Sequence, residues 1–146
     1  MENPFAGQDI QILSAYREKL ESFVARREGK NASYLSHPFD RNVDIWFAAI
    51  MLAVRKGIAP VPVQGVSYKA AEGTVLGSDV WRATALCMLA IAHHDNAEIV
   101  DSPPDMMRLA NGLANAGFPE LFSLLDQRGN DTALDFLCDE ISKLVD

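Results

Sequence analysis

The spacing of apolar and polar residues along the chain predicts a succession of helices. Over residues 8–28, apolar side chains recur at intervals of three and four with charged residues between them, which is typical of a helix with one buried face. A second pattern over residues 41–55 has a broader apolar stripe and ends in Arg55, Lys56 and Gly57, which favour a helix C-terminus. We expect this second helix to be central to the core.

The segment 57–77 interrupts the helical pattern. Pro60 and Pro62 block a helix, and glycines at several later positions break up the rest. The valines between them and Tyr68 favour extended structure. The segment is therefore predicted to be irregular or to form a short β-hairpin, and a connection of this length is often functional.

Helical patterns resume in the second half of the chain. They cover residues 79–93, a stretch from Ser102 to about residue 116, residues 118–128, and a last helix after a Gly-Asn-Asp turn. Between residues 109 and 121 the chain is rich in alanine, asparagine and glycine. This stretch predicts a helix that ends sharply before a proline-initiated helix, with small side chains that let helices approach closely.

Together these patterns predict an all-α or mainly α fold. We expect a single compact bundle of five to six helices, with the irregular or β-hairpin insertion around 57–77 and one helical domain over residues 1–146. A chain of this length can bury a sufficient core without a disulfide or a metal. Trp46 and Trp81 both fall in apolar stripes and are expected in that core.

The sequence also favours a cytoplasmic location. The longest apolar tract, residues 45–54, is too short to span a membrane, and the first residues lack the pattern of a signal peptide. The two cysteines, Cys87 and Cys138, lie in helical patterns and are expected to be reduced.

Charge is distributed unevenly. Residues 1–70 contain nine Lys/Arg and seven Asp/Glu, a balance of +2, whereas residues 71–146 contain four and thirteen, a balance of −9. The acidic half repels phosphate backbones, which disfavours nucleic acid as a partner without excluding a local basic patch. The best such candidate comprises Arg26, Arg27 and Lys30 with Tyr34 close by, and Arg55 and Lys56 as an extension.

Candidate catalytic and metal-binding groups each have a simpler structural interpretation. Adjacent His93 and His94 on a helix point about 100° apart and are poorly placed to share a metal ion. The serines lack a nucleophile motif, and the glycines of 65–77 lack the pattern of a phosphate-binding loop. Asp135 and Asp139 share a helix face that we expect to be solvated. We therefore expect no catalytic residue, metal or cofactor.

Two segments resemble one protein family. The first is FDRNVDIWFAAI over residues 39–50, followed by Arg55-Lys56-Gly57 and Pro60. The second comprises residues 86–92, Asp95, residues 99–101 and the alanine- and asparagine-rich stretch 109–118. They resemble the small accessory proteins associated with bacterial DNA phosphorothioation (Dnd) gene clusters. That family has a Tyr-Ala-Asn-Gly-Gly-like turn, whereas residues 109–113 read LANGL, without the tyrosine and the second glycine. The resemblance spans roughly residues 37–125. It implies a component of a DNA-modification or anti-phage defence system, and it carries over no catalytic residue.

These observations lead to two functional hypotheses. The first is a non-enzymatic accessory or adaptor subunit that binds other proteins of a multi-gene system, with no membrane contact and with self-association left open. The alternative is a small nucleic-acid-binding regulator, in which Arg26, Arg27 and Lys30 contact phosphates and the 57–77 insertion acts as a wing. A small hydrolase with an unrecognised site is the least favoured class.

Overall fold

A computed structural model describes residues 2–25 and 33–145 of the chain and shows a mainly helical protein. The described α-helices are α1 (Arg17–Glu21), α3 (Asn42–Lys56), α4 (Val80–His94), α5 (Pro103–Asp126) and α6 (Ala133–Val145). Two strands, β1 (Asp9–Leu13) and β2 (Ser67–Glu72), form a small antiparallel sheet. Short 3-10 helices cover Ser14–Tyr16, Gly73–Gly77 and Ala97–Asp101. The expected mainly α character is confirmed, and the packing of the helices as a bundle stays a prediction.

The predicted first helix over residues 8–28 is wrong at both ends of its described part: residues 9–13 are a strand, and α1 ends at Glu21, with Val24 in an isolated β-bridge to Phe39. Residues 9–13 form β1, because Ile10 and Ile12 alternate with polar neighbours and both are fully buried on one face of the strand. In so short a stretch, the apolar spacing of a strand and that of a helix share several positions and are difficult to tell apart. Pairing with β2 determines that these residues form a strand. Helical structure begins only at Ser14.

The predicted hairpin within 57–77 is also wrong, although β2 does lie there. The partner of β2 is β1, with Asp9 opposite Glu72 and Ile12 opposite Tyr68, and a bulge lies between Ile10 and Gln11. Residues 57–66 contain neither helix nor strand, so the irregular part of the prediction is confirmed. The sheet thus joins segments almost sixty residues apart, a pairing that local patterns do not encode.

Helix α5 is continuous where the sequence predicted a break near Gly117. Pro119 lies inside the helix, at the cost of one backbone hydrogen bond. Tertiary packing outweighs that cost, because fifteen residues of α5 are buried. The predicted close approach through small residues is confirmed, but it joins α5 to α3: a Cβ at Gly117 would lie 2.0 Å from the carbonyl oxygen of Ala49.

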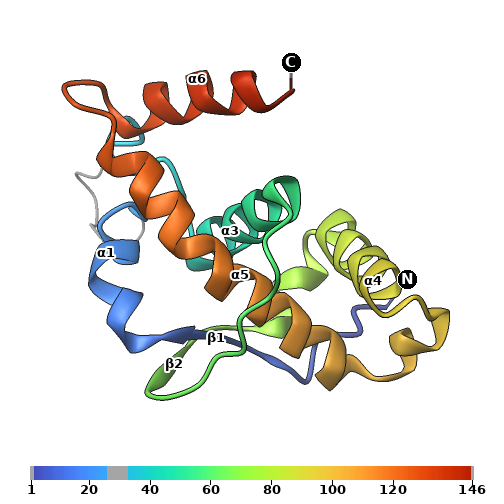
Figure 1. Cartoon of the computed structure of the whole chain (residues 1–146). Helices are drawn as coiled ribbons and strands as arrows, with labels where there is room; N and C mark the ends of the chain where they lie inside the picture. Colours follow the sequence, from blue (N-terminus) through green and yellow to red (C-terminus); the bar gives the residue numbers. More distant parts are fainter. Residues whose placement is uncertain (1, 26–32, 146) are drawn as a thin grey trace.

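The centre of the core lies where α3 crosses α5, with the sheet on one side (Figure 1). Trp46 is fully buried there, as expected, and its indole nitrogen donates to the Asn111 side-chain oxygen (3.2 Å). The Asn111 amide also accepts from the backbone of Gln11 and donates to that of Asp9. One buried side chain therefore ties both long helices to β1.

Candidate partner-binding surface

Helix α4 has two apolar faces, one buried against the rest of the fold and one exposed to solvent. Its buried face consists of Ala83, Leu86, Cys87 and Ala90. The opposite side presents Val80, Trp81, Thr84, Met88 and Ala92 to solvent, a set that we call the α4 stripe. At 100° per residue these five positions share one side of the helix. Exposed fractions of 60% for Trp81 and 64% for Met88 are large for apolar side chains on a folded surface.

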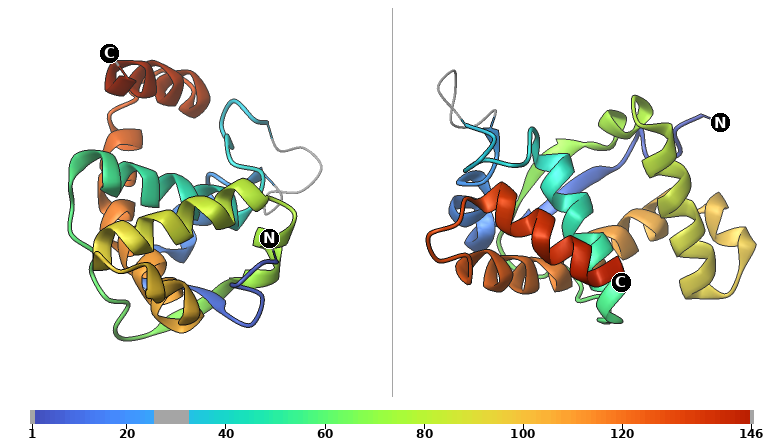
Figure 2. Two further views of the ribbon diagram at one scale, coloured as in Figure 1. Left: turned by 90° about the vertical axis from the view of Figure 1, so that its right-hand side faces the viewer. Right: turned by 90° about the horizontal axis from the view of Figure 1, so that it is seen from above.

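The expectation that Trp81 lies in the core is therefore wrong. The apolar residues of α4 surround the whole helix, and only one side can face α5 and the adjoining 3-10 helices Gly73–Gly77 and Ala97–Asp101. Residues 80–92 contain a single charged residue, Arg82, and this lack of charge on a surface helix was the signal available in the sequence. Figure 2 shows α4 at the edge of the molecule, with one side free of other elements.

Trp81 is held in place by its neighbours. Its ring meets that of Phe47 edge to face, with centroids 5.3 Å apart. The Arg82 guanidinium lies 5.1 Å from the Trp81 ring centroid and 5.2 Å from that of Phe47. Because the indole is braced on two sides, it loses little freedom when a partner covers it.

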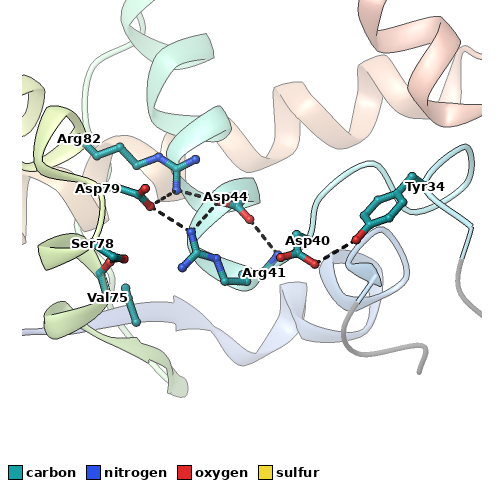
Figure 3. Close-up of polar contacts among 8 residues, drawn as sticks. All are labelled: Tyr34, Asp40, Arg41, Asp44, Val75, Ser78, Asp79 and Arg82. Carbon is teal, nitrogen blue, oxygen red and sulfur yellow. Dashed lines mark hydrogen bonds and ion pairs between the residues drawn. The ribbon is translucent and has the colours of Figure 1, made fainter. Parts of the chain in front are cut away.

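Arg82 belongs to a cluster of four charged residues between the N-terminal ends of α3 and α4, drawn in Figure 3. An Arg82 guanidinium nitrogen (Nη1) lies 2.7 Å from Asp44 Oδ1 and 3.5 Å from Asp79 Oδ2, and an Arg41 nitrogen (Nη2) lies 3.0 Å from Asp79 Oδ2. These ion pairs join α4 to α3 and fix the guanidinium beneath the Trp81 ring.

The electrostatics of this cluster favour its charged form. Burial alone would raise the pKa of the Asp44 carboxyl, but hydrogen bonds from Arg82 and from the Arg41 backbone N–H outweigh burial and hold that pKa below its usual range. Burial likewise opposes the charge of Arg41, yet its bonds to Asp79 and Asp44 raise the pKa of the guanidinium. The cluster thus links α3 to α4 through ion pairs in which the Asp44 carboxylate stays ionised at neutral pH.

The other end of the α4 stripe is acidic. Asp95, which ends α4 in a left-handed conformation (φ 50°), and the following Glu98 and Asp101 are exposed; we call these three residues the acidic rim. The next carboxylate, Asp105, is paired with Arg108. An apolar strip bounded at one end by carboxylates is complementary to a segment that combines apolar and basic side chains.

The basic patch predicted from the sequence does not form a continuous surface among the described residues. Tyr34 lies before α3, its hydroxyl 3.4 Å from Asp40 Oδ1, whereas Arg55 and Lys56 lie at the far end of that helix, roughly 20 Å away at 1.5 Å per residue. Lys56 pairs with Glu120 (3.2 Å), and Arg55 donates to the Leu144 carbonyl. Arg26, Arg27 and Lys30 lie outside the described residues.

Two other candidates from the sequence, the His93–His94 pair and Ser67, do not form a reactive group among residues 2–25 and 33–145. The rings of His93 and His94 stand edge to face, 5.1 Å apart, and no three or more His, Cys, Asp or Glu side chains are placed to hold a metal ion. An open hollow of about 580 Å³ between β1, the 62–64 loop and α5 has both polar and apolar walls. Ser67 is among its lining residues, and the Ser67 hydroxyl donates to the Gln11 amide oxygen at 3.4 Å. An amide oxygen is not a base that activates serine.

Comparison of the chain with protein-family models, with curated proteins and with solved structures gives no match. No helix in the described part is long and apolar enough to cross a bilayer. The resemblance to Dnd-associated proteins therefore stays a prediction.

Proposed function

We propose that this protein is a non-enzymatic adaptor of the cytoplasm that binds another protein through the α4 stripe. The observation that carries the proposal is the exposed, braced indole of Trp81 at the start of an uncharged helix face. Buried aromatic anchors supply most of the energy at protein interfaces, and tryptophan is the most enriched of them.

The partner that fits this surface is an amphipathic helix with basic residues toward one end. From Val80 to Ala92 the α4 stripe runs about 18 Å, which accommodates three turns of a second helix. Its apolar anchors would cover Trp81 and Met88, and its lysines or arginines would lie against the acidic rim. The resemblance to Dnd-associated proteins adds the setting, a bacterial DNA-modification or anti-phage system, to the same proposal.

Site-specific photocrosslinking in the native host tests the proposal. A photoreactive benzoylphenylalanine at Met88 should give one discrete crosslinked product with a different protein, and Trp81→Ser should abolish it. The same probe at Val66, an exposed apolar residue beside β2, is the matched control and should not give that product. Mass spectrometry of the product should map the contact to a segment with apolar and basic residues.

Two results would overturn the proposal. One is a crosslink pattern at Met88 that equals the pattern at Val66. The other is a product that contains only a second copy of this chain, which would make the α4 stripe a self-association surface.

A further inference from the structure

A second feature, distant from the α4 stripe, is an apolar cavity beneath the C-terminal helix. It has a volume of about 360 Å³, and its lining residues come mostly from α6, α3 and α5. Its lining residues are almost all apolar and include Ala48, Leu121, Leu124, Leu137, Ile141 and Leu144. Because the lining residue Ile141 remains exposed, this hollow opens to solvent, and an apolar guest that filled it would remove its apolar lining from water.

Helix α6 covers one side of this cavity and is only loosely packed against the rest of the protein. Of its residues only Ala133 and Leu137 are buried, and Ile141, which lines the cavity, is still 57% exposed. Polar contacts hold it at its two ends: the Leu134 N–H donates to the Leu35 carbonyl (2.9 Å), and Arg55 donates to the Leu144 carbonyl. Because α6 is held at its ends and loosely packed between them, a hydrocarbon chain has room to enter beneath the helix from the side.

Arg55 is the one charged residue of the cavity lining, and its geometry favours an anion. Its Nε and Nη2 atoms lie 3.0 and 2.6 Å from the same Leu144 oxygen. A guanidinium has five N–H donors, so in the described part of the chain the outer edge of this group, Nη1 and the second hydrogen of Nη2, is left for another acceptor. Two parallel N–H groups match the two oxygens of a carboxylate.

We propose that this cavity binds a single-chain aliphatic carboxylate, such as a medium-chain fatty acid. The hydrocarbon chain lies beneath α6 among the leucines of α5 and α6, and the carboxylate pairs with the outer edge of the Arg55 guanidinium. A volume of 360 Å³ is at the lower end of the range for small-molecule pockets, which suits one chain and excludes a two-chain lipid. This proposal is independent of the partner-binding function.

The test is calorimetric titration of the whole protein with octanoate and with 1-octanol, each below its micelle- or phase-forming concentration. Comparing the two ligands separates the contribution of the carboxylate from that of the hydrocarbon chain. Octanoate should bind the wild-type protein and raise its thermal midpoint. Arg55→Gln should weaken octanoate binding about tenfold, the value of a charge-assisted pair at a partly exposed site, and should leave octanol binding within about twofold. Lys56→Gln, the neighbouring cation that pairs with Glu120 outside the cavity, is the matched control and should change neither.

A variant that fills the cavity tests where the chain lies. Ala48 lines the cavity from α3, so Ala48→Phe should abolish binding of both probes while the circular dichroism spectrum stays native. The proposal is overturned if octanoate fails to bind the folded wild-type chain, if Arg55→Gln weakens octanoate and octanol equally, or if native Ala48→Phe binds octanoate as the wild type does.

Discussion

Replacing Gly117 by alanine tests the close approach of α5 to α3 on which the core depends. An ideal Cβ at this position would lie 2.0 Å from the Ala49 carbonyl oxygen and 2.7 Å from its carbon, so the helices must separate by about 1 Å to reach even 3.0 Å. The obstacle is backbone, which cannot rotate away as a side chain does. Such overpacking costs about 3 kcal/mol, and the separation also weakens dispersion contacts along the crossing.

Gly112 provides a matched control on the same helix. A Cβ there would meet the Pro60 Cβ at 3.3 Å, a contact that a small shift relieves. Both substitutions gain about 1 kcal/mol of helix propensity and restrict the unfolded chain equally. We therefore expect Gly117→Ala to lose about 2 kcal/mol of unfolding free energy, and Gly112→Ala to gain about 0.5 kcal/mol.

Urea unfolding followed by circular dichroism measures this difference. With a slope of about 2 kcal/mol per molar urea, the midpoints of the two variants should differ by about 1 M, with Gly117→Ala the less stable. Equal midpoints for the two variants would refute the close helix crossing.

Two further predictions follow from buried polar groups. Asp44→Asn leaves Arg82, whose side chain is only 14% exposed, without its nearest carboxylate, and should cost about 2 kcal/mol at neutral pH. Because the folded pKa of Asp44 lies below its usual value of about 4, its stabilisation is present above that pH and is lost as the pH falls. The urea midpoints of wild type and variant should thus converge in acid, and a gap that widens there would contradict the ion-pair cluster. Asn111→Ala removes the hydrogen-bond acceptor of the buried Trp46 indole and both hydrogen bonds to β1, and should lower the free energy of unfolding by about 3 kcal/mol. An unchanged urea midpoint would contradict the role of Asn111 in joining α3 and α5 to β1.

The sequence predicts best the elements that local signals define completely. The helix over 41–55 is observed as Asn42–Lys56 and ends at Gly57 in the left-handed conformation, and that over 79–93 is observed as Val80–His94. In both, a long periodic pattern coincides with clear end signals. The sheet was missed because β1 and β2 are each too short to be recognised without their partner.

The candidate surface was missed for a different reason. A helical pattern shows which residues are apolar, but it does not show how many faces of the helix the rest of the fold covers. The pattern therefore predicts a core position for Trp81 as well as for Trp46, and only Trp46 is buried. The two tryptophans differ only in what surrounds their helices: α3 is buried against α5 and α4 lies at an edge. The cavity beneath α6 likewise arises from how loosely that helix is seated, which no local pattern encodes.

The most direct test of the adaptor function is calorimetric titration of the purified protein with the purified partner identified by the Met88 crosslink. We expect Trp81→Ser to weaken binding at least tenfold, Val66→Ser to leave affinity unchanged although Val66 is 81% exposed, and added salt to weaken the wild-type complex through the acidic rim. Equal affinities for wild type, Trp81→Ser and Val66→Ser would contradict the proposal that the α4 stripe binds the partner.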